Sequence, residues 1–98
     1  MIDTSQIRLG QLVTSIAGRD KGRKLIVIDI VDDLHVVVAD GDLRRLAKRK
    51  IKKMRHLNVS KQVFNEVAEI IESHGKLTDE KLRKLLEMVL NQVSDGGA

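Results

Sequence analysis

Hydrophobic and polar residues alternate in short runs through the first half of the chain, and turn residues separate these runs. This pattern predicts strands at about 11–17, 23–31, 34–39, 42–46 and 52–57, because alternation with β-branched residues is typical of half-buried strands. Asp32-Asp33 and Asp40-Gly41 are turn signals, and the glycine supplies the positive φ that a tight hairpin needs. Four or five short strands in sequence close most economically into a small barrel with few exposed edges.

The strongest strand, 23–31, is apolar on both of its faces. Side chains alternate along a strand, so one face carries Ile26, Ile28 and Ile30, and we expect it to point into the barrel. Val13 and either Val36 or Val38 are expected beside it. The other face carries Leu25, Val27 and Val31, which predicts that a second layer covers it.

The period of the pattern changes to that of a helix in the last third of the chain. Two apolar stripes mark two helices, the first formed by Val63, Val67, Ile70 and Ile71 and the second by Leu82, Leu85, Leu86, Val89 and Val93. Ser60 and Thr78 are predicted N-caps, and Gly75 is a predicted C′ residue. The predicted organisation is a barrel at 1–57, an antiparallel helical hairpin at 58–93 that covers it, and a flexible tail at 94–98.

Composition supports a small globular domain of 98 residues with no cysteine. No apolar run approaches the roughly 18 residues that a membrane span needs, and the N-terminus does not resemble a signal peptide. These features predict a cytoplasmic protein that does not enter a membrane.

Charge is distributed unevenly along the chain. Residues 1–57 hold 13 Lys and Arg against 7 Asp and Glu, whereas residues 58–98 hold 5 against 7, which gives +6 and −2. The basic part is expected to bind a polyanion and the second part to be accessory. Phe64 is the one Phe, Tyr or Trp in the chain, so the barrel has no aromatic platform on which to stack bases.

Two glycines bracket a charged turn ahead of the strongest strand, in the stretch Gly18-Arg19-Asp20-Lys21-Gly22. Glycine allows the backbone to approach a ligand closely, and the two cations would project from the loop. Arg23 and Lys24 continue the positive charge into the strand. Asp20 is expected to organise the turn through its own side chain. The alternative interpretation is a solvated hairpin tip.

The stretch 43–55 contains eight cations and no acid. Such a density costs stability through repulsion unless an anion lies nearby, and interspersed apolar residues indicate that the stretch is folded. The predicted RNA contacts in this region are Arg44, Arg45, Lys48, Arg49, Lys50, Lys52, Lys53, Arg55 and the adjacent His56. A solvated charged face is the alternative.

No pattern in the chain points to catalysis or to a metal. His35, His56 and His74 are too far apart in sequence for a compact metal motif. No nucleophile, base and orienting group occur together. The sequence therefore predicts neither an enzyme nor a cofactor.

The chain resembles the KOW module across about residues 9–57. The resemblance rests on Gly10-x-x-Val13-x-Ser15-x-Ala17-Gly18-x-Asp20-Lys21-Gly22, on the aliphatic strand at 25–31 and on the Val-Val-Val-Ala-Asp-Gly that ends at Gly41. The ending, with Lys48-Arg49-Lys50 and Arg55-His56-Leu57, is similar to the basic segment of KOW ribosomal proteins of the archaeal and eukaryotic large subunit and their short bacterial relatives. This resemblance implies a Src-homology-3-like barrel that binds structured RNA, typically ribosomal, with Lys21 and Gly22 as the Lys-Gly pair of the motif.

The sequence thus leaves two hypotheses. The first is a ribosome-associated protein that binds structured RNA by neutralising phosphates and by fitting its shape. The second is an adaptor of the transcription or translation machinery that contacts proteins through the barrel and the helical hairpin, as the KOW modules of elongation factors imply.

Overall fold

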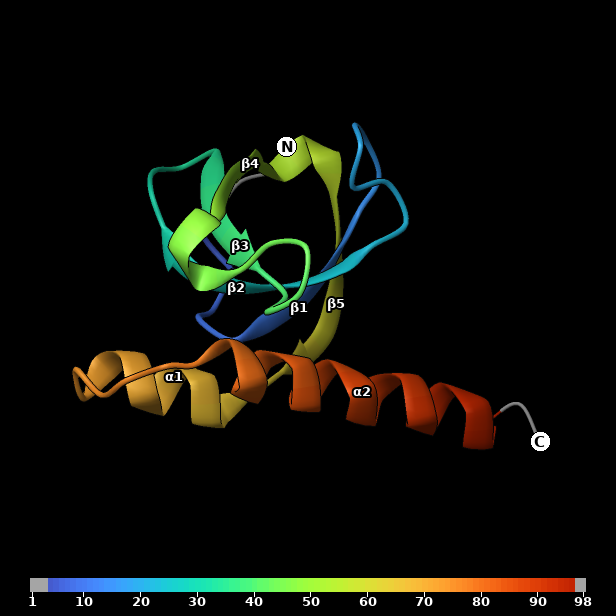
Figure 1. Ribbon diagram of the computed structural model, residues 1–98. Helices are drawn as coiled ribbons and strands as arrows, with labels where there is room; N and C mark the ends of the chain where they lie inside the picture. Colours follow the sequence, from blue (N-terminus) through green and yellow to red (C-terminus); the bar gives the residue numbers. More distant parts are fainter. Residues whose placement is uncertain (1–3, 97–98) are drawn as a thin grey trace.

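The computed structural model of the protein describes residues 4–96, with side chains up to residue 90, and shows a curved sheet lying on two helices (Figure 1). The elements, in chain order, are β1 (Gln11–Ser15), β2 (Lys24–Ile30), β3 (His35–Ala39), the 3-10 helix η1 (Leu46–Lys48), β4 (Lys50–Lys53), the 3-10 helix η2 (Met54–His56), β5 (Leu57–Val63), α1 (Asn65–Glu72) and α2 (Asp79–Gly96). No helix within residues 4–96 has the length and apolar character needed to cross a membrane.

The five strands form one antiparallel sheet in the order β4-β3-β2-β1-β5. The sheet curls so that η2 joins the two outer strands at the end of the molecule far from the helices (Figure 1). No ladder joins β4 directly to β5 among the described residues, so the barrel stays open along this seam. The predicted small barrel of four or five strands followed by helices is confirmed, with five strands and an open seam.

Two apolar cores lie on opposite faces of the sheet. The core inside the barrel contains Val13, Leu25, Val27, Val36, Val38, Met54 and Leu57, with Ile7 and Ile30 packed against it. The core between the sheet and the helices contains Leu12, Ile26, Ile28, Val37, Ala39, Phe64, Val67, Leu82, Leu85 and Val89. The helices therefore share a core with the outer face of the sheet, as the apolar second face of β2 indicated.

The predicted facing of β2 was wrong. Ile26 and Ile28 point toward the helices, and Leu25 and Val27 fill the barrel. The register with β3 shifts between Val27 and Asp29, where β2 carries one extra residue. This irregularity reverses the alternation, so Ile30 joins the inner core. Val31, predicted on the covered face, is half exposed.

The strand predicted at 42–46 does not form. Residues 40–49 instead make a loop that contains η1, and the next strand, β4, starts at Lys50. The carboxylate of Asp40 accepts hydrogen bonds from the backbone N–H groups of Asp42 and Arg44, at 2.8 and 2.9 Å. These bonds satisfy the backbone locally, so the segment has no need of a strand partner. The strand predicted at 52–57 is likewise divided among β4, η2 and the start of β5.

Ser60 does not cap a helix, because β5 continues to Val63 and pairs there with β1. The first helix starts at Asn65, directly after Phe64. At this junction Phe64 donates its N–H to the carbonyl of Gly10 at 2.8 Å. A Cβ on Gly10 would lie 2.3 Å from the Phe64 carbonyl oxygen, and Gly10 has a φ of +86°. Glycine is therefore required where the last strand leaves the sheet.

His74, and not Gly75, takes the left-handed position after α1, with a φ of 59°. The N–H groups of His74 and Gly75 bond to the carbonyls of Ile71 and Ile70, at 3.1 and 2.8 Å. This pattern is a Schellman motif in which His74 is the C′ residue and Gly75, predicted as C′, lies at C″. The predicted cap at Thr78 is confirmed, because its hydroxyl accepts the N–H of Lys81 at 3.2 Å.

The two helices cover the same face of the sheet but overlap little along their lengths (Figure 1). The chain returns alongside α1, and α2 starts beside the start of α1 and runs beyond the barrel. An ion pair at 2.6 Å between Lys81 Nζ and Glu66 Oε2 joins the two helix starts. The backbone of α2 continues to Gly96, into the segment predicted as a flexible tail, whose last two residues lie outside the described range.

Candidate nucleic-acid interface

The charged turn between β1 and β2 is closed by its own backbone. Gly22 donates to the Ser15 carbonyl at 2.7 Å, and Arg23 donates to the Asp20 carbonyl at 2.8 Å. Gly18 and Gly22 both have positive φ, at 78° and 87°, which explains why glycine occupies these positions. The turn holds the exposed side chains of Arg19 and Lys21 at its tip.

The side chain of Asp20 points back into the molecule and does not organise its own turn, contrary to the prediction. It lies 3.2 Å from Arg44 Nε and 3.6 Å from Lys52 Nζ, and it is only 6% exposed. Burial by itself would raise the pKa of Asp20. The hydrogen bond from Arg44 and the positive charges of Arg44 and Lys52 outweigh burial, so the pKa is lowered. Asp20 therefore remains ionised and ties the loop to the β3–β4 loop and β4.

Lys52 is the buried cation of this cluster. Its ammonium donates to the Ser15 hydroxyl and to the Ala17 carbonyl, both at 3.3 Å, in addition to its ion pair with Asp20. A buried ammonium is stable only when its charge and its donors are satisfied, and these three oxygens satisfy them. Lys52 is thus held inside the end of the barrel and is not available at the surface.

Arg23 is also neutralised within the fold. Its guanidinium pairs with Asp40 at 2.5 Å and with Asp42 at 3.0 Å. The pKa of Arg23 is raised, chiefly by the hydrogen bond to Asp40. Burial would raise the pKa of Asp40, but the N–H groups of Asp42 and Arg44 and the Arg23 guanidinium lower it overall. Neither Asp20 nor Asp40 was predicted to pair with the candidate cations.

The remaining candidate cations are mostly free. Eight of the candidate cations are exposed and form no ion pair with a described residue: Arg19, Lys21, Arg45, Lys48, Arg49, Lys50, Lys53 and Arg55. Lys24 and His56 are half-buried. The carbonyl of His56 accepts the N–H of Ile16 at 2.9 Å, which fastens η2 to the charged loop.

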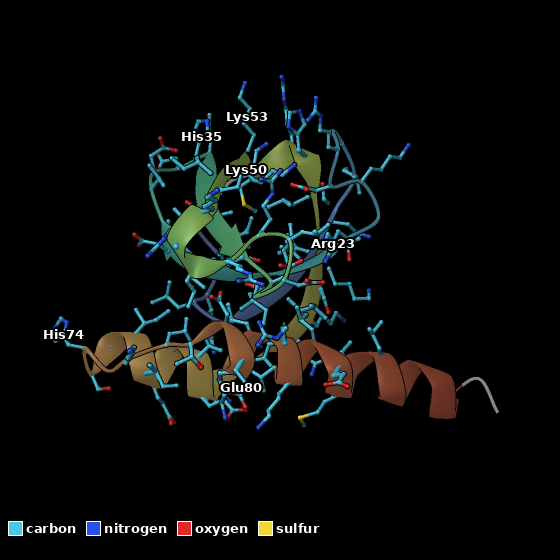
Figure 2. The ribbon with its side chains drawn as sticks, in the orientation of Figure 1. Arg23, His35, Lys50, Lys53, His74 and Glu80 are labelled. Atoms are coloured by element: carbon cyan, nitrogen blue, oxygen red, sulfur yellow. The ribbon has the colours of Figure 1, made fainter. Side chains whose placement is uncertain are left out.

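The fold separates these free cations into two groups. We call Arg19, Lys21, Lys50, Lys53 and Arg55 the basic rim, since their loop, strand and 3-10 helix meet at the end of the barrel away from α1 and α2 (Figure 1). Figure 2 shows Lys50 and Lys53 at this end. Arg45, Lys48 and Arg49 belong to η1 and its caps, on the side of the barrel. The N–H of Leu46 bonds to Asp79 Oδ1 at 2.7 Å, which anchors η1 to the start of α2.

A groove of about 710 Å³ lies between α2 and the barrel. Its lining carries the cations Arg23, Lys24, Arg83 and Lys84, the acids Asp40, Asp42, Glu80 and Glu87, and also Gly22, Leu86 and Leu90. The charges of the groove balance, so it does not favour a polyanion. Within the described part of the chain, no three His, Asp or Glu side chains come close enough to hold a metal ion.

The two buried carboxylates predict how stability depends on pH. Both Asp20 and Asp40 have lowered pKa values in the folded state. Their contribution is therefore complete above the unfolded aspartate pKa of about 3.9 and is lost as pH falls through the folded values. Thermal melts followed by circular dichroism should show a nearly constant Tm from pH 8 to pH 5 and a steep fall below about pH 4. Asp40→Asn should make the decrease in Tm below about pH 4 less steep. An unchanged decrease would show that Asp40 does not stabilise the fold through its charge.

Comparison with known proteins identifies relatives of this chain, although no family model matches it. A large ribosomal subunit protein eL14 of Pyrobaculum aerophilum is 31% identical over 77 residues, which cover 70% of this chain and 75% of the relative. The eL14 protein of Pyrobaculum calidifontis is 30% identical over 81 residues, or 83% and 72% of the two chains. That of Staphylothermus marinus is 27% identical over 86 residues, or 88% and 83%.

The alignments with all three relatives extend beyond the barrel, since they cover 70%, 83% and 88% of this chain and the last strand ends at Val63 of 98 residues. The likeness therefore includes helical residues as well as the stretch at 9–57 that carries the KOW motif. The resemblance to KOW ribosomal proteins of the large subunit is thereby confirmed. This chain, a KOW-type barrel followed by two helices, belongs to the eL14 family of large ribosomal subunit proteins.

Proposed function

We propose that this protein is a component of the large ribosomal subunit and binds ribosomal RNA through the basic rim. Its relatives are named large ribosomal subunit proteins. The observation that carries the proposal is the basic rim itself, in which three separate segments bring five exposed cations to one end of the barrel. None of these five forms an ion pair with a described carboxylate, so their charge is available to phosphates.

Binding works by charge and shape and does not require base stacking. Phe64, the chain's one Phe, Tyr or Trp, is buried against the helices. Asp20 and the carbonyl of His56 join the charged loop to β4 and η2, so the backbone segments that carry the cations are held next to one another. A fixed array of cations selects an RNA whose phosphates have matching positions, which is how structured RNA is recognised without reading its bases.

The predicted RNA-contact residues outside the basic rim have other roles in this proposal. Arg45, Lys48 and Arg49 extend the contact along the side of the barrel, where η1 presents them. Arg23, Arg44 and Lys52 act as internal counter-charges that hold the loops in place, because each is paired with a buried carboxylate. Lys24 and His56 border the contact, and Gly18 and Gly22 shape the loop. The role is one of binding and not of catalysis.

The test measures binding to an in vitro transcript of large-subunit ribosomal RNA, with footprinting to locate the protected fragment. If about six phosphates are neutralised, log K should fall with log salt with a slope near −5. We expect a discrete footprint and a salt-dependent affinity. Binding that is independent of salt, or protection spread evenly over the transcript, would contradict the proposal.

A second experiment separates RNA binding from the adaptor hypothesis. Association with ribosomal particles is followed in sucrose gradients at low and high salt, with and without ribonuclease. RNA binding predicts release by salt and by ribonuclease, since phosphate contacts are screened and RNA is removed. Salt-resistant association with one protein after ribonuclease treatment would support the adaptor hypothesis instead.

A further inference from the structure

His35 lies next to the basic rim, although the sequence did not mark it as a candidate RNA contact. It is the first residue of β3, and its register partner on β4 is Lys53. Paired residues on adjacent antiparallel strands project to the same face, at a strand spacing of about 4.8 Å. Figure 2 shows His35 and Lys53 at the same end of the barrel, away from the helices. The side chain of His35 is 31% exposed.

Asp32 fixes the orientation of the His35 ring. Its Oδ1 atom lies 2.8 Å from His35 Nδ1 and also accepts the N–H of Leu34 at 2.8 Å. The turn that contains Asp32 is also bonded to the N-terminal segment, because the Thr4 hydroxyl donates to the Asp32 carbonyl at 2.8 Å. The hydrogen bonds from Leu34 and His35 lower the pKa of Asp32, so the carboxylate remains ionised.

An ionised carboxylate can only accept hydrogen bonds, so the hydrogen between the two residues belongs to His35 Nδ1. In the neutral imidazole the second nitrogen, Nε2, then has no hydrogen and is an acceptor. Nε2 makes no hydrogen bond to a residue within the described range. The structure therefore presents a partly exposed acceptor in a fixed orientation at the edge of the basic rim.

Such an acceptor does not suit a phosphate oxygen, which is itself an acceptor. The carboxylates of Asp32 and Asp33, both in exposed turn residues, further disfavour a phosphate at this position. A hydroxyl group, in contrast, can donate to Nε2. In RNA each ribose 2′-hydroxyl lies beside the phosphate on the 3′ side of the same nucleotide. Lys53 can bind that phosphate from the neighbouring strand while His35 receives the hydroxyl hydrogen.

We propose that His35 Nε2 accepts a hydrogen bond from a ribose 2′-hydroxyl next to the phosphate bound by Lys53, and that this contact helps the protein distinguish RNA from DNA. The inference rests on the proposed function and adds a specific element to it. The cations of the rim cannot make this distinction, because DNA presents the same phosphates. The 2′-hydroxyl is the group by which a protein separates the two polymers at a given site.

The test is a thermodynamic cycle on the ribosomal RNA fragment that footprinting identifies. The fragment is synthesised as RNA and as 2′-O-methyl RNA, in which the 2′ oxygen remains but has no hydrogen to donate. Each form is titrated at pH 8 with the wild-type protein and with His35→Ala. The wild type should lose affinity on 2′-O-methylation by about 3- to 10-fold more than the variant does, which corresponds to one hydrogen bond.

His74→Asn is the matched control, because His74 is an exposed histidine at the far end of α1 (Figure 2). Asparagine tolerates its positive φ, and the variant should behave as wild type in the cycle. Nitrogen chemical shifts of His35 provide an independent measurement and should show the hydrogen on Nδ1 in the free protein. Equal losses for wild type and His35→Ala, or a hydrogen on Nε2, would overturn the inference. Failure of the wild type to bind the RNA fragment at all would overturn the proposed function instead.

Discussion

Arg19→Glu combined with Lys21→Glu should lower the affinity for large-subunit ribosomal RNA by roughly 50-fold or more at 0.1 M salt. Each phosphate contact contributes about 0.9 to the slope of log K against log salt, so the loss of two contacts reduces the slope by about 2. Both side chains are exposed at the tip of the charged loop and form no ion pair with a described residue. Equilibrium titrations at four salt concentrations measure the affinity and the slope together.

The fold should survive this change, because the loop is closed by backbone bonds that neither side chain makes. Lys61→Glu with Lys76→Glu is the matched control, since it makes the same change of charge at exposed positions of β5 and the α1–α2 connection. The control should bind RNA much more tightly than the rim variant. Equal losses in the two double variants would mean that net charge, and not the basic rim, determines binding.

Asp20→Asn should lower the free energy of unfolding by about 3 kcal/mol, because it removes the charge that compensates a buried ammonium. The Lys52 side chain is 8% exposed, and Asp20 is the one carboxylate that pairs with it among the described residues. For a domain of this size the loss corresponds to a decrease in Tm of about 12–24 °C. Chemical denaturation followed by circular dichroism measures the change, since the chain contains no tryptophan or tyrosine.

A second variant separates lost charge balance from lost shape. Asp20→Asn with Lys52→Met replaces the buried ion pair by neutral groups of similar size, and it should recover much of the stability. A single variant as stable as wild type would show that the ion pair adds nothing to the fold.

Some elements could be predicted because their causes are local. The strand at 23–31 and the cap at Thr78 depend on residues within a few positions, and the structure confirms both as β2 and the start of α2. Other elements could not. The segment at 42–46 has a strand-like context, but the carboxylate of Asp40 takes its backbone N–H groups. Ser60 resembles a helix cap, yet pairing with β1 keeps it in β5.

The sequence by itself determined that strands precede helices, that positive charge is in excess before residue 58, and that the first half resembles the KOW module. All three follow from residue types and short spacings along the chain. It could not determine which face of β2 lies inside the barrel, because both faces are apolar and the extra residue near Asp29 reverses the alternation.

Only the tertiary structure decided which cations are free to bind RNA. Asp20 meets Arg44 and Lys52, which are 24 and 32 positions away, and Arg23 meets Asp40, which is 17 positions away. The strength of an ion pair depends on distance through space and on burial, and neither can be read along the chain. The fold therefore divides the candidate cations into three sets. One set is paired with buried carboxylates inside the fold, one lies on η1 at the side of the barrel, and one forms the basic rim.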